Sequence, residues 1–341
     1  MRASATALLI ALAARAEAQQ ALPPQQLPQL MEPRSIMSLP QARPAKTMSY
    51  GPHKSQVVEL FLPAKRGEAL LPVVVMIHGG CFLKDLPGRE LMRAAAGAFT
   101  AKGFAVWSVG YRRVDEEGGG YPGTFQDMAA AIDLVRDHAA EHGLDLARVA
   151  AFGHSAGGVL ALWAAGRRNI APSSALYAPD PLPLRAVVSV GGFGDLRTFA
   201  PTIAIACGPK ALPALVRERP ASPEPDAAPA DAPADQEDGA TPSPVAAADS
   251  DAPPAQPGRA DPFADTSPAA LLPTRVPVVM LHGVYDHVAF PAVGLFHAQT
   301  ARRAGDRVEL YVAPNAGHFE VIAPGHRAFE QALAALERFL Q

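Results

Sequence analysis

Runs of β-branched residues that end in glycine alternate along this chain with segments of helical spacing. LPVVVMIHGG at 71–80 is almost continuously apolar, and such runs fit strands buried on both faces of a sheet. The same reading predicts strands at 57–62, 104–111, 148–155, 184–192, 276–283 and 307–313, and helices at 89–102, 124–143, 156–168 and 328–340. The alternation predicts an α/β fold, with a mostly parallel sheet and helices on both faces.

Composition and charge exclude some classes of partner and site. Of the 341 residues, 49% are hydrophobic, which is enough for a sizeable core, and the formal net charge is -3. A nucleic-acid-binding chain would favour a basic patch or stripe, so we expect no nucleic-acid partner. The two cysteines, Cys81 and Cys207, are too few and too far apart for a zinc-finger framework, and no metal site is expected.

Three segments depart from the alternation. Residues 1–18 combine Arg2, an apolar run and a small-residue cleavage site ending at Ala18, which predicts a secretory signal peptide. That run is shorter than the roughly 20 residues that span a bilayer, and no other stretch is long enough, so no membrane span is expected. Residues 19–46 are rich in Gln and Pro and are predicted to be a linker.

The third segment interrupts what we predict to be one domain from 47 to 341. Residues 220–258 contain eight acidic residues, no Lys or Arg, and mostly Ala, Pro and Ser otherwise. Such a segment cannot bury enough apolar surface to offset its ordering entropy. Because predicted strands resume after it, we interpret it as a disordered insert inside the domain, with solubility as its simplest role.

GHSAGG at 153–158 has the G-x-S-x-G spacing around Ser155. It follows a predicted strand and opens a predicted helix, which is the context of a nucleophile elbow. The alternative is a serine in an ordinary glycine-rich turn. Small residues are needed at 153 and 157 because side chains there would collide with neighbouring elements, and the helix N-terminus favours negative charge.

A serine hydroxyl needs a base, and the base needs an acid that fixes its tautomer. In this layout the chain order is serine, acid, histidine. His318 lies in the loop after the last predicted strand, and Asp286 directly follows the strand at 276–281. The weaker alternatives are the acids Asp306 and Glu320 and the histidines His282, His287, His297 and His326.

HGGCF at 78–82 supplies the third part of the predicted site. Acyl transfer builds an oxyanion, which backbone N–H groups must meet. Ala156 follows the nucleophile and offers one donor, and the glycine-rich loop offers Gly80 and Cys81. The alternative is a plain Gly-Gly turn. Phe82, Tyr111 and Phe193 are candidates for the substrate pocket, with core packing at least as good an explanation; Trp163 is expected in the core.

These motifs together resemble those of α/β-hydrolase fold serine esterases, and most of all bacterial esterases similar to feruloyl esterases and kynurenine formamidase. The resemblance covers roughly 48–210 and 260–340 and rests on YGPHKSQVVELFLP, HGGCF, GHSAGG, LHGVYD and NAGHFE. Many relatives have HGGG or HGG-aromatic-Trp, whereas this chain has Cys81-Phe82. The insert at 220–258 is also unlike the compact family pattern.

The predicted function is a serine hydrolase that cleaves small carboxylic esters through an acyl-enzyme, without metal or cofactor. Ser155 is the predicted nucleophile, His318 the base and Asp286 the orienting acid. An arylformamidase or another amidase, or an exopeptidase, would use the same machinery. A ligand-binding protein on a hydrolase scaffold is the alternative from another class. The signal peptide predicts a secreted or periplasmic location, and the sequence leaves the oligomeric state open.

Export would place the two cysteines where disulfides persist. Cys81 follows the predicted oxyanion loop, and Cys207 lies beyond the strand at 184–190. Segments that follow parallel strands gather at the same sheet edge as the nucleophile. A Cys81–Cys207 disulfide is therefore predicted, and two separate buried thiols are the alternative.

Overall fold

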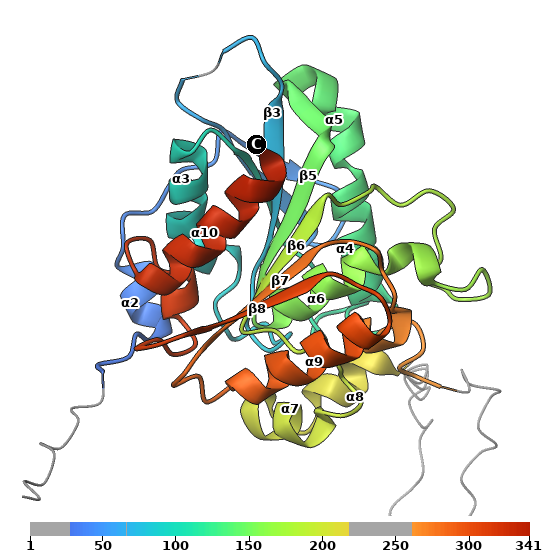
Figure 1. The fold of residues 1–341 in the computed structure, drawn as a ribbon. Coiled ribbons are helices and arrows are strands. Elements are labelled where there is room, and N and C mark those ends of the chain that lie inside the picture. The colour runs from blue at the N-terminus through green and yellow to red at the C-terminus, as the bar shows by residue number, and fades with distance from the viewer. Residues whose placement is uncertain (1–27, 66, 218–260) are drawn as a thin grey trace, which may run out of the picture. The chain divides into compact units, whose positions relative to one another are not determined.

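The computed structural model describes residues 28–65, 67–217 and 261–341, and within them eight strands form one sheet. The order across the sheet is β1-β2-β4-β3-β5-β6-β7-β8 (Figure 1). β1 and β2 are antiparallel to their neighbours, and from β4 to β8 all neighbours are parallel. The strands are β1 (Lys46–Ser49), β2 (Val57–Phe61), β3 (Leu71–Ile77), β4 (Ala105–Val109), β5 (Leu144–His154), β6 (Ala186–Val190), β7 (Val278–Gly283) and β8 (Val308–Ala313).

Helices cover both faces of this sheet, which confirms the predicted fold class (Figure 1). One face carries α3 (Arg93–Ala101) and α10 (Arg327–Leu340). The other carries α4 (Gly123–Asp133), α5 (Val135–His142), α6 (Ala156–Ala165) and α9 (Pro291–Arg303). The shorter elements are α2 (Pro33–Met37), α7 (Ala200–Cys207), α8 (Ala211–Val216), η1 (Arg89–Met92), η2 (Arg167–Asn169), η3 (Pro268–Leu271) and η4 (Glu320–Ile322).

The central strand β3 explains why its sequence is continuously apolar. Successive side chains of a strand point to opposite faces. Val73 and Val75 join the core under α4 and α6, whereas Val74 and Met76 join the core under α3 and α10. Both faces of β3 are therefore buried. A polar side chain on either face would lose its hydration, so the sequence shows no alternation of polar and apolar residues.

The structure departs from the predicted linker at 19–46 from Pro33 onward, and residues 19–27 lie outside the described residues. From Pro33 onward the chain forms α2, whose Ile36 is fully buried, and β1 begins at Lys46. Proline is tolerated in the first turn of a helix, because its missing N–H has no partner there in any case. A five-residue helix with one buried side chain leaves no periodicity that a sequence pattern could reveal.

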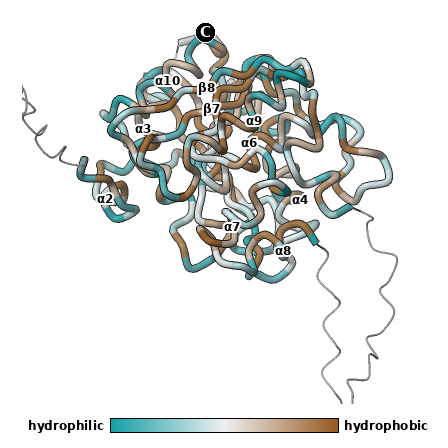
Figure 2. The backbone as a smooth tube through the Cα atoms, turned by 60° about the horizontal axis from the view of Figure 1, so that its bottom comes forward, coloured by the Kyte–Doolittle hydropathy of each residue, from teal (hydrophilic) through white to brown (hydrophobic). Residues whose placement is uncertain are grey.

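Two other segments differ from the predicted pattern. The helix expected at 124–143 is divided at Leu134 into α4 and α5. After β6 the chain forms α7 and α8, which carry hydrophobic stretches (Figure 2) and were not predicted. The predicted signal peptide at 1–18 and the insert at 220–258 lie outside the described residues. None of the helices described is both long and apolar enough to cross a membrane.

Candidate active site

Ser155 occupies the sharp turn between β5 and α6. Its backbone has φ 54° and ψ −119°, a strained conformation for a residue with a side chain, and its N–H donates to Val190 at 2.9 Å. A Cβ at Gly153 would lie 2.1 Å from the carbonyl oxygen of Gly157, and a Cβ at Gly157 would lie 2.1 Å from that of Ile77. The two glycines are therefore required by close backbone packing, which fixes the turn that exposes the serine.

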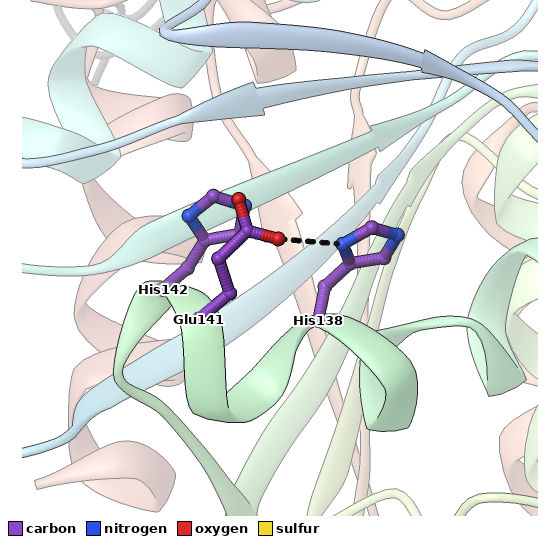
Figure 3. A group of neighbouring side chains, drawn as sticks. All are labelled: His138, Glu141 and His142. Carbon is purple, nitrogen blue, oxygen red and sulfur yellow. Dashed lines mark ion pairs between the residues drawn. The ribbon is translucent and has the colours of Figure 1, made fainter.

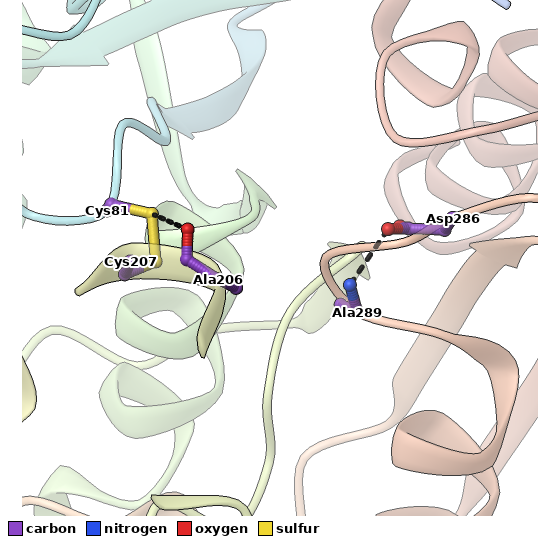
Figure 4. The surroundings of a disulfide bond; sticks show 5 residues. All are labelled: Cys81, Ala206, Cys207, Asp286 and Ala289. Carbon is purple, nitrogen blue, oxygen red and sulfur yellow. Dashed lines mark hydrogen bonds between the residues drawn. A yellow bond between two sulfur atoms is a disulfide. The ribbon is translucent and has the colours of Figure 1, made fainter. Parts of the chain in front are cut away.

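His318 and Asp286 form a buried pair at the carboxyl end of the sheet. The Nδ1–H of His318 donates to Asp286 Oδ2 at 2.8 Å, and the carboxylate side chain is fully buried. The other oxygen, Oδ1, accepts the amides of Val288 and Ala289 at 2.8 Å each (Figure 4). These bonds hold the carboxylate in place, so that it fixes the orientation of the imidazole ring.

Asp286 keeps its negative charge although its side chain is buried. Burial by itself raises the pKa of this carboxyl group, but the hydrogen bond and charge of His318 and the two backbone amides outweigh it, and the pKa is lowered. Gly191, with φ +62°, lies against the pair: a Cβ there would be 3.1 Å from the His318 ring and 3.3 Å from Asp286 Oδ2. Sequence reasoning did not single out Gly191, although the pair of glycines after β6 was visible.

His154 precedes the serine and lies behind His318. Its Nε2 is 2.8 Å from the carbonyl oxygen of His318, and the two rings are 4.7 Å apart. Burial, reinforced by the neighbouring His318, lowers the pKa of His154 to about 3. His154 is therefore neutral at neutral pH and holds the loop that carries His318, a role that the sequence did not reveal.

The loop after β3, predicted to supply oxyanion donors, forms a tight turn with positive φ at three successive residues. Gly80, Cys81 and Phe82 have φ of 101°, 50° and 60°, and the N–H of Leu83 closes the turn onto Gly80 at 2.8 Å. Cys81 is joined to Cys207 of α7 by a disulfide with a Cα separation of 5.2 Å (Figure 4). The loop is thus tied covalently to a helix 126 residues away in the sequence.

A small cavity of about 190 Å³ opens over Ser155. Ser155, His318 and His154 line it together with Gly80 and Cys81. The remaining walls are mostly apolar and come from residues distant in the sequence: Pro33, Leu86, Pro87, Leu91, Ala206, Val288 and Phe319. Ala156, the first residue of α6, lies directly after the serine, where a helix leaves its amides without intrahelical partners.

The prediction that Phe82, Tyr111 and Phe193 line the substrate pocket is corrected by the structure, because none of them lines this cavity. Each is buried in the core beneath α4 and α6, because the turn at 80–82 and the sheet carry these rings inward. The hydroxyl of Tyr111 donates to the carbonyl of His78 at 2.9 Å, and its ring stacks on His78. Trp163 is also fully buried. Pro33 gave no signal in the sequence, whereas Phe319 directly follows His318.

The alternative acids and bases have other partners. Asp306 accepts the amides of Thr274 and Arg275 at 2.8 Å each. Glu320 accepts the amides of Gly317 and Met31. His282 lies 2.8 Å from the carbonyl of Ala289, and His297 is buried beside Gly194. Asp306 holds the segment before β7, at the opposite end of the strands from Ser155. Asp286 is the acid in contact with His318.

Comparison with known proteins gives matches for the family and the fold. The BD-FAE family model matches residues 58–255. Esterase LipI of Mycobacterium tuberculosis (strain ATCC 25618 / H37Rv) is 36% identical over 102 residues, which cover 29% of this chain and 30% of LipI. The chain therefore matches less than a third of the length of that relative.

Two solved structures share the fold over most of this chain. A bifunctional GH43-CE of Bacteroides eggerthii has a TM-score of 0.61 at 19% identity, covering 86% of this chain and 37% of that one. The propionate-bound esterase Est2 of Thermogutta terrifontis has a TM-score of 0.56 at 20% identity, covering 87% of this chain and 93% of that one. Because the family model covers more than half of the chain, the chain belongs to the BD-FAE family, and its fold is that of an α/β-hydrolase.

Proposed function

We propose that this chain is a carboxylic ester hydrolase that works through an acyl-enzyme. One observation carries the proposal: a serine in a strained strand-to-helix turn lines the same small cavity as a histidine that is hydrogen-bonded to a buried carboxylate. Its membership of the BD-FAE family and its likeness to chains named as esterases support the same reaction class.

In the first half of the reaction, Ser155 Oγ attacks the ester carbonyl and its proton passes to Nε2 of His318. The imidazolium that forms is stabilised by Asp286, whose carboxylate contacts Nδ1 at 2.8 Å. The tetrahedral intermediate collapses, the leaving alcohol takes the proton from His318, and an acyl-Ser155 ester remains. Water, deprotonated by His318, then attacks that ester. Collapse of the second tetrahedral intermediate releases the acid, and His318 returns the proton to Ser155 Oγ.

We assign the backbone amides of Gly80, Cys81 and Ala156 as the hydrogen-bond donors that stabilise the oxyanion of the tetrahedral intermediate. The left-handed turn at 80–82 and the start of α6 both border the cavity above Ser155. The backbone hydrogen bonds found among the described residues include none donated by Gly80 or Cys81, so these two amides remain available. Preorganised donors of this kind are typically worth about 100- to 1,000-fold in rate each.

The substrate class follows from the size and lining of the cavity. Its volume of about 190 Å³ is below the roughly 300–1,000 Å³ of pockets that enclose drug-sized ligands. Leu86, Leu91 and Phe319 give it an apolar wall without a charged side chain opposite the serine. We assign it to a short, uncharged acyl group and leave the larger alcohol group outside it.

The Cys81–Cys207 disulfide supports action outside the cytoplasm, because disulfides persist in oxidising compartments. The proposed location is secreted or periplasmic. Mass spectrometry of the protein from its native compartment, alkylated with and without prior reduction, tests this proposal. Two alkyl groups added without reductant would contradict it.

Ser155→Ala tests the assignment of the nucleophile. Hydrolysis of p-nitrophenyl acetate should fall by on the order of a million-fold, because members of a triad act as a unit. Labelling by a fluorophosphonate probe should disappear as well, while the circular dichroism spectrum is retained. Ser173→Ala, at an exposed serine, is the matched control and should keep full activity and labelling. Turnover of Ser155→Ala above a few per cent of wild type would contradict the assignment.

A substrate panel tests the reaction class and the acyl preference. It contains p-nitrophenyl esters with acyl chains of 2 to about 12 carbons, aryl esters, N-formylkynurenine and aminoacyl-anilides. We expect the highest kcat/KM for acyl chains of about 2 to 4 carbons, since longer chains exceed the cavity. Higher kcat/KM on the formamide or anilides would instead indicate an amidase or exopeptidase, and binding without turnover would indicate a receptor.

A further inference from the structure

A second group of histidine and carboxylate donors lies on α5, at the other end of β5 from Ser155. His138, Glu141 and His142 occupy positions i, i+3 and i+4 of the helix, so their side chains share one face. One donor atom from each lies within 4.8 Å of the others, and the three side chains extend to the same side of the helix (Figure 3).

The spacing of these atoms fits a small divalent ion. His138 Nδ1 is 3.6 Å from Glu141 Oε2, and His142 Nε2 is 3.5 Å from Glu141 Oε1. Tetrahedral zinc with ligands at about 2.0–2.1 Å needs neighbouring donors about 3.3 Å apart. The donors of the cluster lie within 4.8 Å of one another, so the two histidine side chains and Glu141 must together close by up to about 1.5 Å to reach that geometry.

The surroundings hold the two imidazole rings in place. The His138 and His142 side chains are only 22% and 12% exposed, and the ring of His138 packs 5.6 Å from Trp107. His138 Nδ1 is buried and has no hydrogen-bond partner in the described part of the chain. α5 ends at His142, where the negative end of the helix dipole favours a cation.

Lys46 already places a positive charge beside this cluster. Its ammonium contacts Glu141 Oε1 at 2.7 Å from the edge strand β1, and it is partly exposed. The contact is the main cause of the lowered pKa of Glu141. Because Lys46 is a flexible surface side chain, a doubly charged ion can displace it, although the lysine competes for the carboxylate.

We propose that His138, Glu141 and His142 form a binding site for a divalent transition-metal ion of the zinc class, separate from the catalytic centre. Two imidazoles and one carboxylate suit zinc, with water as the fourth ligand. β5 pairs with β3 from Leu71 and Leu144 to Ile77 and Gly153, and six β3 residues at roughly 3.3 Å each put about 20 Å of sheet between the start of β5 and the turn at Ser155. The ion would stabilise the junction of α5 and β5, and no step of ester hydrolysis passes through it.

Isothermal titration of the untagged, EDTA-treated full chain with zinc chloride tests the proposal. Wild type should bind one equivalent with a dissociation constant tighter than about 10 µM, and zinc should raise its melting temperature. His138→Ala and His142→Ala should each weaken binding by at least about 10-fold. Lys46→Met should tighten it by about 2- to 5-fold, since the competing ammonium is gone.

Asp137→Asn is the matched control, because Asp137 is an exposed carboxylate on the same helix outside the cluster. Its affinity for zinc should equal that of wild type. Absence of binding below about 100 µM, or wild-type affinity in both histidine variants, would overturn the proposal. Should the alanine variants fail to fold, Lys46→Met decides alone: tighter binding supports the site, and unchanged or weaker binding overturns it. These results are independent of the proposed esterase activity.

Discussion

The two ends of β5 carry the same kinds of side chain in different arrangements. At the carboxyl end, Asp286 is fully buried, contacts His318 at 2.8 Å and accepts two backbone amides. At the amino end, Glu141 is 55% exposed and lies 3.6 Å and 3.5 Å from two histidines. Burial and backbone donors hold one pair rigidly, which suits the proposed proton transfer, while the looser spacing of the other group suits the proposed cation site.

The largest effect is expected from a substitution that breaks the pair of His318 and Asp286 at the carboxyl end of β5. Asp286→Asn keeps the shape of the side chain but removes the charge that selects the tautomer of His318, so kcat should fall by about 10⁴-fold. The measurement is steady-state hydrolysis of p-nitrophenyl acetate. Asp306→Asn is the control: it removes another buried carboxylate, one that binds the amides of Thr274 and Arg275, and should keep kcat within about 3-fold of wild type per folded molecule. A comparable loss in both variants would contradict the special role of Asp286.

The next effect is a pH dependence of the free energy of unfolding, caused by buried histidines near the carboxyl end of the sheet. Burial lowers the pKa of His78 and of His154 to about 3. Between about pH 6.5 and 3 the unfolded chain therefore binds protons that the folded chain does not, so stability falls as the pH falls. The two residues together should cost about 3 kcal/mol per pH unit in this window.

Urea unfolding at pH 7, 6 and 5 measures that slope. His154→Gln should reduce the slope by about 1.4 kcal/mol per pH unit, the share of one histidine that no longer titrates. A free energy of unfolding that stays constant from pH 7 to pH 5 would show that these histidines are protonated in the folded chain.

A smaller effect is expected from removing the Cys81–Cys207 disulfide, a covalent restraint that the carboxyl end has and the amino end lacks. Replacing both cysteines, Cys81→Ser with Cys207→Ser, should lower the free energy of unfolding by about 2–4 kcal/mol, chiefly by freeing the unfolded chain. Chemical denaturation of the double variant under non-reducing conditions is the measurement. Reduced wild type should show the same loss, and an unchanged free energy in the double variant would contradict the prediction.

The smallest effect tests whether the two ends are independent. Glu141→Gln removes the amino-end carboxylate, and kcat/KM for p-nitrophenyl acetate should change by less than about 2-fold, because distant sites without shared partners act additively. A tenfold loss of kcat/KM in a folded variant would mean that the ends communicate through β5.

The parts of the site that follow from strand ends could be predicted from sequence. Ser155 directly follows β5, and Asp286 and His318 lie in the loops after β7 and β8. Because the carboxyl ends of parallel strands meet at one edge, chain order and strand position were sufficient to predict their proximity. The same rule led to the pairing of Cys81 with Cys207, which the structure contains. Continuous apolar runs located the central strands because both faces of the sheet are buried.

The cavity walls could not be predicted in this way. Pro33 reaches the site from a short helix in a segment of linker-like composition, and Ala206 reaches it from α7. Phe82 and Phe193 adjoin the motifs in sequence, yet positive φ at 82 and the packing of the loop after β6 direct their rings into the core. Which way a loop side chain points depends on backbone torsions and tertiary contacts, and a residue pattern does not encode these locally.

The disulfide between Cys81 and Cys207 also turns part of the chain into a closed ring. The ring runs from Cys81 to Cys207 and holds β4, β5 with Ser155 at its end, and β6, while Asp286 and His318 lie on the linear segment beyond it. A protease that cuts one peptide bond within the ring produces a nicked molecule rather than two separate fragments. After a cut between Ser155 and Cys207, the bridge keeps Ser155 in one covalent species with Asp286 and His318 until a reductant opens it.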